Sequence, residues 1–192
     1  MKREQVFERA FAESIRLHER VREHGAAALL AAVDAIQRAW NGGGKVLAFG
    51  NGGSAADAQH VAAELVGRFT RDRRALAALA LSVDTSVVTA IANDAGYNRI
   101  FARQIEALGR RGDVALGITT SGSSPNIVAA LERARALGLT TIALTGRDGG
   151  TTTRFADVHI NVPDASTARV QEVHRTLLHV MCEILEQELT PE

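Results

Sequence analysis

The sequence is poor in cysteine and in aromatic residues, and it has no excess charge of either sign. Its single cysteine, Cys182, excludes an intrachain disulfide and is typical of a cytoplasmic protein, which is the location we expect. Lysine plus arginine and aspartate plus glutamate each total 22, so no basic excess favours binding to nucleic acid. Aromatic residues make up 4% of the chain and hydrophobic residues 46%, so the core must consist largely of Ala, Val, Leu and Ile.

Long apolar runs are also missing. No run is long enough to span a bilayer, no basic amphipathic segment favours a membrane surface, and no apolar stretch follows the charged residues after Met1. We therefore expect no signal peptide, and neither a membrane nor a nucleic acid as partner. A chain of 192 residues without a long linker or a low-complexity tract is predicted to form one domain over residues 1–192.

From residue 45 onward, short apolar segments alternate with helical patterns. Strands are predicted at 45–49, 76–82, 113–119, 140–145 and 157–162. Helices are predicted at 54–69, 85–92, 98–108, 124–137 and 166–189. Some of the strands are continuously apolar, as expected when helices cover both faces of a parallel sheet. The sequence therefore predicts an α/β fold, in which ligands bind at the carboxyl ends of the strands.

Residues 4–41 precede this unit and predict two helices, with a break at Gly25. Apolar residues recur at helical spacing in both halves, with Arg and Glu between them. Such an arm either covers one face of the sheet or packs against another subunit. The apolar pattern is common to both arrangements, so it does not decide between them.

Two loops rich in serine and glycine follow predicted strands. The first is Gly50-Asn51-Gly52-Gly53-Ser54, and the second is Thr119-Thr120-Ser121-Gly122-Ser123-Ser124. Backbone N–H groups in such loops, together with those at a helix start, bind anions. Neither loop has a lysine placed to clamp a nucleoside triphosphate, so the pair indicates a sugar phosphate rather than ATP.

Each loop also has a simpler interpretation, which is a tight strand-to-helix turn for the first and a polar, solvated loop for the second. The first resembles a dinucleotide-binding turn, but Ala55 replaces its last glycine, and Ser54 is expected to act as the helix N-cap. The second loop supplies five hydroxyl groups in six positions, followed by Pro125 at a helix start. Five hydroxyls exceed what a cap needs, which favours a phosphate site.

Four polar residues on two predicted helices suggest a metal site. His60 and Glu64 are four residues apart and share a helix face, while Gln171 and His179 lie on the last helix. Nitrogen and oxygen ligands of this kind suit Zn2+, although glutamine is an unusual ligand. Gln171 and His179 are separated by about 12 Å along a helix, so one metal would need extended side chains or two subunits. His18, His24 and His159 are expected to be surface or hydrogen-bonded residues.

Taken together, these segments resemble the phosphoheptose isomerase family of the sugar isomerase (SIS) domain superfamily. The matching stretches are Gly50–Ser54 through Asp57–His60 to Glu64-Leu65, Ile91–Asp94, Thr119–Ser124, Leu144–Gly150, and Arg169–His174 with His179. The resemblance covers essentially the whole chain, including the helical arm. Two departures are Thr119, where Ser is frequent, and Ser123-Ser124-Pro125, where Asn-Ser-Ala is typical.

The resemblance implies a flavodoxin-like three-layer sandwich with a five-stranded parallel sheet, assembled as a homotetramer with active sites at subunit contacts. It implies that the arm, residues 4–41, takes part in oligomerisation. It implies sugar contacts at Asn51, Gly52, Gly53, Asn93 and Asp94, with Ser54, Glu64 and Gln171 also at the substrate. It implies phosphate contacts at Thr119, Thr120, Ser121 and Ser124. It implies one Zn2+ per subunit, held by His60, Glu64, Gln171 and His179.

The implied reaction is the isomerisation of sedoheptulose 7-phosphate to D-glycero-D-manno-heptose 7-phosphate through an enediol, the first step towards nucleotide-activated heptose for lipopolysaccharide or other glycans. We hypothesise that Glu64 is the base and His179 the acid, with zinc polarising the carbonyl. The main alternative is a noncatalytic tetrameric paralogue that binds the replication initiator, but such proteins typically lack the residues equivalent to Glu64 and His179. A sugar-phosphate-sensing module is a second alternative, although those normally carry a further domain.

Overall fold

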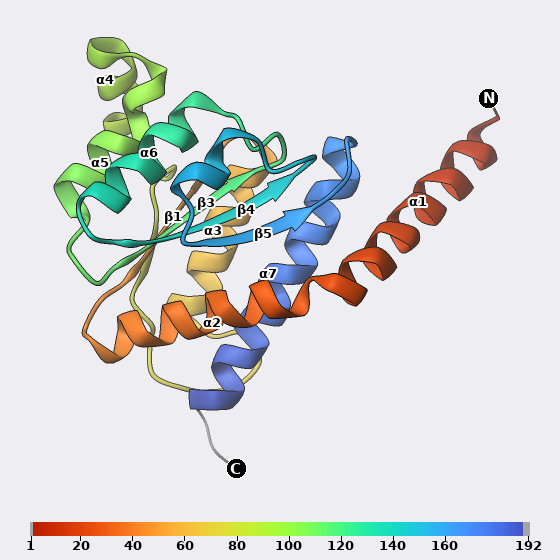
Figure 1. Cartoon of the computed structure of the whole chain (residues 1–192), viewed down its shortest axis with the longest axis horizontal. Coiled ribbons are helices and arrows are strands. Elements are labelled where there is room, and N and C mark those ends of the chain that lie inside the picture. Colours follow the sequence, from red (N-terminus) through yellow and green to blue (C-terminus); the bar gives the residue numbers. More distant parts are fainter. Residues whose placement is uncertain (1, 190–192) are drawn as a thin grey trace.

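The computed structural model describes residues 2–189 and contains one five-stranded sheet (Figure 1). Its strands are β1 (Val46–Gly50), β2 (Ala78–Ala80), β3 (Val114–Thr119), β4 (Thr140–Gly146) and β5 (Val158–Val162). All neighbouring strands are parallel, and their order is β2-β1-β3-β4-β5. This is the flavodoxin-like order, so the predicted fold is confirmed.

Helices cover both faces of the sheet and make three layers (Figure 1). One face carries α2 (Ala26–Asn41), α3 (Gly53–Val66) and α7 (Thr167–Leu189). The other carries α4 (Thr85–Ala95), α5 (Ile100–Leu108) and α6 (Pro125–Ala136), together with the short helices η1 (Tyr97–Arg99) and η2 (Gly150–Phe155). Alternate residues of a strand serve different layers, so that Val46 and Ala48 belong to the first core and Leu47 and Phe49 to the second.

The two N-terminal helices are placed differently relative to the sheet. α2 packs on the sheet through residues such as Val33 and Ile36, which are almost fully buried. α1 (Arg3–His24) extends away from the sheet (Figure 1), and only Leu17 and Val21 of this helix are buried. On this helix Phe7, Phe11 and Ile15 are more than half exposed. No helix within residues 2–189 is both long and apolar enough to cross a membrane.

The structure corrects several predicted boundaries near the site. α3 begins at Gly53, and its N-cap is Gly52, whose φ of +55° suits glycine, so Ser54 is not the N-cap and lies buried inside the first turn. α3 also ends at Val66 rather than at residue 69. The second strand is only three residues long and pairs with β1 over Ala78–Ala80 alone.

Candidate active site

The two serine- and glycine-rich loops meet at the carboxyl ends of β1 and β3. These strands are neighbours, with Gly50 opposite Ile118, and the order of strands reverses between them. Asn51 of the first loop and the buried Asn126 at the start of α6 exchange two side-chain hydrogen bonds of 2.8 and 2.9 Å. The loops are therefore fixed to each other at the point where parallel sheets bind ligands.

Three hydroxyl groups of the second loop converge, and we call Thr119, Ser121 and Ser124 the hydroxyl cradle. Thr119 Oγ1 lies 3.1 Å from Ser124 Oγ and 3.3 Å from Ser121 Oγ. Pro125 occupies the first turn of α6, as the sequence predicts. The hydroxyls therefore lie at the positive end of a helix, which is a favourable place for an anion.

Thr119 and Ser124 of the hydroxyl cradle border a cavity of about 320 Å³, and Ser121 lies beside them outside its lining. Its lining residues are Asn51, Gly52, Gly53, Ser54, Ile118, Thr119, Thr120, Ser124, Thr167 and Gln171. Most of the residues expected to contact substrate thus surround one cavity, and no lysine or arginine within residues 2–189 lines it. The cavity offers neutral hydroxyl, amide and backbone donors to a ligand.

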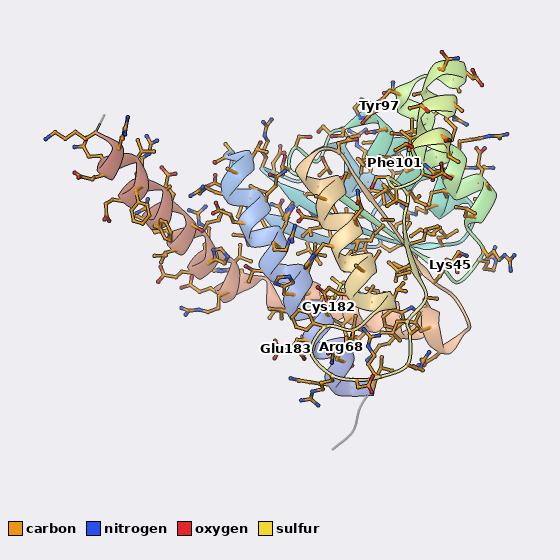
Figure 2. The ribbon with its side chains drawn as sticks, turned by 180° about the vertical axis from the view of Figure 1, so that it is seen from behind. Lys45, Arg68, Tyr97, Phe101, Cys182 and Glu183 are labelled. Carbon is orange, nitrogen blue, oxygen red and sulfur yellow. The ribbon has the colours of Figure 1, made fainter. Side chains whose placement is uncertain are left out.

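Asn93 and Asp94 lie elsewhere in this chain. Both are exposed on α4, a helix without buried residues, and the Asn93 amide donates a hydrogen bond of 2.8 Å to Asp94. Tyr97 follows α4 (Figure 2), and its hydroxyl donates a hydrogen bond of 3.1 Å to Asn51, which lines the cavity. Through Asn51, Tyr97 therefore connects the cavity to the end of α4.

A second polar group lies between α3 and α7, which pack side by side, and we call His60, Glu64 and His179 the histidine–carboxylate group. The Nε2 atoms of His60 and His179 are 2.8 Å apart, and His60 Nε2 is 3.4 Å from a Glu64 carboxylate oxygen. Burial, followed by the positive charge of Arg175, lowers the pKa of His60. Neutral imidazole with a free nitrogen lone pair is therefore the favoured form of His60 at neutral pH.

The donor types of this group fit zinc, which accepts neutral imidazole nitrogen and carboxylate oxygen. The geometry of a closed centre is not formed, because no three His, Cys, Asp or Glu side chains among residues 2–189 are arranged to hold a metal ion. Gln171 lies against Gly53 at the cavity, about two helical turns of α7 from His179. One chain thus brings together His60, Glu64 and His179 and keeps Gln171 apart from them.

Two charged residues at the site were not singled out as functional in the sequence. Arg175 lies midway between Gln171 and His179 on α7, and its Nη2 atom is 2.5 Å from Oδ1 of Asp57, a buried residue on α3. Gln171, Arg175 and His179 follow one another at intervals of four residues on α7, and this spacing could have identified Arg175 from the sequence. On α3, Asp57 precedes His60 by three residues. Both therefore lie on the helix faces that carry the histidine–carboxylate group.

The remaining histidines within the described residues have ordinary partners. His174 is fully buried, and its Nε2 atom lies 2.9 Å from the carbonyl oxygen of Thr145. His159 lies 2.7 Å from the Thr145 hydroxyl, and His18 lies 2.9 Å from the Thr176 hydroxyl. His24 is exposed. The expectation that His18, His24 and His159 are surface or hydrogen-bonded residues is confirmed.

Comparison with known proteins agrees with this architecture. The family model described as the SIS domain matches residues 10–146. A phosphoheptose isomerase of Roseiflexus sp. (strain RS-1) is 51% identical over 179 residues, which are 93% of this chain and 91% of the relative. The chain belongs to the phosphoheptose isomerase family of SIS-domain proteins. A phosphoheptose isomerase of Aquifex aeolicus is 57% identical over 79% of this chain and 80% of its own length.

Solved structures of the phosphoheptose isomerase family extend the agreement to three dimensions. The structure of a phosphoheptose isomerase from Neisseria gonorrhoeae superimposes with a TM-score of 0.92 at 44% identity, and the match covers 96% of this chain and 99% of that one. The N-terminal helices are therefore part of the shared fold, because so little of either chain lies outside the match.

Proposed function

We propose that this protein isomerises sedoheptulose 7-phosphate to D-glycero-D-manno-heptose 7-phosphate, as an aldose–ketose isomerase. Membership of the phosphoheptose isomerase family, at about half identity over most of the chain, carries this conclusion. The residues support it, because Glu64 and His179 are both present and lie together with His60. A noncatalytic paralogue is expected to lack the residues equivalent to Glu64 and His179, so the enzyme is favoured over the initiator-binding alternative.

In this proposal the hydroxyl cradle binds the phosphate. Thr119, Ser121 and Ser124 provide three hydroxyls within 3.5 Å of one another, and the start of α6 adds its dipole and backbone donors. Asn51 and the backbone of Gly52 and Gly53 face the same cavity and suit the hydroxyl groups of the sugar chain. Reactant and product carry the same phosphate, so this end of the site anchors both.

The isomerisation moves one proton between carbons and one between oxygens. Glu64 takes a proton from C1 of the ketose, which gives an enediol, and then returns a proton to C2. His179 transfers the proton of the O1 hydroxyl to O2, so that the carbonyl moves from C2 to C1. General acid–base groups of this kind supply about 10²–10⁴-fold in rate.

We also propose that His60, Glu64 and His179 hold Zn2+, with Gln171 as a further ligand and one metal per subunit. Bound zinc would supply a Lewis acid that polarises the substrate carbonyl. His60 suits this role because burial favours its neutral form. Glu64 serves either as ligand or as base at a given moment, since a tightly coordinated carboxylate oxygen is a poor base.

A homotetramer is the assembly that we propose. Gln171 and His179 lie about 12 Å apart along one rigid helix, so a second subunit is the simplest way to bring both to one metal. The exposed apolar side chains of α1 suit a subunit contact of this kind; they are Val6, Phe7, Phe11 and Ile15. We further propose a cytoplasmic location, in keeping with the lone thiol of Cys182.

The decisive experiment measures conversion of sedoheptulose 7-phosphate by the purified protein and by Glu64→Gln. We expect turnover by the parent protein, its loss on chelation and its recovery with added Zn2+. Glu64→Gln should lose at least about 10²-fold in kcat, because the base is gone, while calorimetry still detects binding of the sugar phosphate. Glu183→Gln, a change on the same helix as His179 but outside the histidine–carboxylate group, is the matched control (Figure 2).

Each outcome of this experiment has a definite meaning. Turnover that survives in Glu64→Gln refutes Glu64 as the base. Turnover that is indifferent to chelation refutes a catalytic role for zinc but leaves the isomerase intact. A parent protein that shows no turnover in any metal state refutes the proposed function and favours the binding-protein alternative.

A further inference from the structure

A buried carboxylate joins the segment after α3 to α7. Glu186 is 1% exposed, and its two oxygens accept hydrogen bonds from the backbone N–H groups of Phe69 at 2.6 Å, Thr70 at 2.8 Å and Arg71 at 2.9 Å. The Thr70 hydroxyl adds a fourth hydrogen bond at 3.2 Å. A carboxylate bound by three successive amides fixes the backbone it binds, because each hydrogen bond to the charged group is worth about 1.5–3 kcal/mol.

Arg73 ties the same carboxylate to the end of α3. Its guanidinium donates hydrogen bonds to the carbonyl oxygens of Glu64 at 2.6 Å, Leu65 at 2.8 Å and Gly67 at 3.0 Å. These include carbonyls of the last helical turn, which have no partner inside the helix. Arg73 Nε lies 3.3 Å from a Glu186 oxygen, and both side chains are 2% exposed.

Both contacts lead directly to the histidine–carboxylate group. Arg73 holds the backbone of Glu64 itself. Glu186 follows His179 by seven residues, which is two turns of α7, so the two side chains lie on one face of the helix. The Phe69 ring, whose backbone Glu186 binds, packs on the His179 ring with centroids 5.5 Å apart.

We propose that Arg73 and Glu186 are positioning residues that set the distance and orientation of Glu64 relative to His179, with Phe69 transmitting the contact to His179. The assignment rests on the proposed function for its catalytic consequence. Neither Arg73 nor Glu186 touches the cavity lined by the hydroxyl cradle. A misplacement of about 1 Å between reacting groups can cost about 10²-fold in rate, so loss of the pair should lower kcat and leave KM nearly unchanged.

The test compares Glu186→Gln and Arg73→Lys with a matched control, Asp113→Asn. Asp113 is also a buried carboxylate, which accepts the backbone N–H of Lys45 at 3.0 Å and of Arg110 at 2.9 Å, and it pairs with Lys45 Nζ at 2.6 Å. Figure 2 labels Lys45 and Arg68 in different parts of the molecule, and Arg68 directly precedes the segment bound by Glu186. Asp113→Asn therefore reports the general cost of weakening a buried ion pair.

Glu186→Gln and Arg73→Lys should reduce kcat by about 10- to 100-fold with KM within about twofold of the parent. Asp113→Asn should lower the melting temperature without this loss of kcat. Phe69→Leu retains all three backbone donors to Glu186 and removes only the ring contact, so it should fold like the parent and reduce kcat severalfold. Equal kcat losses in Glu186→Gln and Asp113→Asn would overturn the proposal, as would a Phe69→Leu variant with parental kcat.

Nuclear magnetic resonance of histidine labelled with 13C at Cε1 gives a readout independent of turnover. The chain has six histidines, and we expect Glu186→Gln and Phe69→Leu to shift the His179 resonance while Asp113→Asn leaves it unchanged. A His179 resonance that both variants leave in place refutes the positioning role. If the parent protein shows no turnover, the proposed function fails, while this measurement still decides whether Glu186 and Phe69 position His179.

Discussion

Gly53→Ala should separate stability from activity. Gly53 is the first residue of α3, and a Cβ atom there would lie 2.6 Å from Nε2, 2.8 Å from Cδ and 2.9 Å from Oε1 of Gln171. All three atoms belong to the far end of a flexible side chain, so the Gln171 amide moves and the backbone stays. The substitution therefore acts on the cavity by displacing one of its lining side chains.

The two effects have opposite signs. Alanine is favoured over glycine in a helix by about 0.5–1 kcal/mol, and the smaller value applies in the first turn, where Gly53 lies. For a chain of this length, that gain raises the melting temperature by about 1–2 °C. If the Gln171 amide binds the substrate as proposed, displacing it removes a hydrogen bond worth about 0.5–1.5 kcal/mol, so kcat/KM should fall about two- to tenfold.

A thermodynamic cycle with Gln171→Ala identifies the cause. Kinetics with sedoheptulose 7-phosphate and thermal unfolding are measured for both single variants and for the double variant. With Gln171 shortened, the methyl group introduced at position 53 has room, so the double variant should match Gln171→Ala in activity. A Gly53→Ala variant with parental kcat/KM would refute the role of Gln171, and fully additive losses would show that the methyl group acts on the substrate directly.

Two further predictions follow from the hydroxyl cradle and from Glu186. Thr119→Val keeps the shape of the side chain and removes one hydroxyl, so KM for the sugar phosphate should rise about 10- to 100-fold while kcat changes little. Inhibition by inorganic phosphate should weaken as well. An unchanged KM would contradict phosphate binding by Thr119. Burial alone would raise the pKa of Glu186, but hydrogen bonds from the backbone of Thr70, Phe69 and Arg71 outweigh it and lower that pKa to about 2. The stabilisation by ionised Glu186, about 3 kcal/mol, is present above pH 4.5 and lost as the pH falls from 4.5 to 2, so urea unfolding of Glu186→Gln should show a flatter acid limb than the parent.

The sequence predicts the parts of the fold that depend on local pattern. β1, β3 and β4 are found within one residue of their predicted ends, because continuous apolar runs mark strands buried on both faces. The predicted strand at 76–82 is too long, since only Ala78–Ala80 of it pair with β1. Alternation of strands and helices also predicts that the two loops share one edge of the sheet.

Contacts between distant segments are not visible in the sequence. Asp57 and Arg175 are 118 residues apart, and Phe69 and Glu186 are 117 apart. Each pair depends on α3 and α7 lying side by side. The pattern of apolar residues predicts that both helices cover the sheet, but it does not predict that they are neighbours. The N-cap at Gly52 was missed for a similar reason, because its positive φ is set by the turn between β1 and α3 rather than by residue preference alone.

The distribution of charge in the site follows from what the reaction changes. The phosphate is the same before and after isomerisation, so binding it tightly stabilises substrate, transition state and product alike and contributes nothing to kcat. Neutral hydroxyl donors are sufficient there, and the lining of the cavity supplies them. Proton transfer instead requires titratable groups held at a fixed spacing. The groups proposed for it, Glu64 and His179, lie on α3 and α7, and Arg73 and Glu186 join the segment after α3 to α7. Thr119→Val and Glu186→Gln should therefore move KM and kcat separately, and a double variant should show both losses in full, because the two ends of the site share no side-chain contact among the described residues.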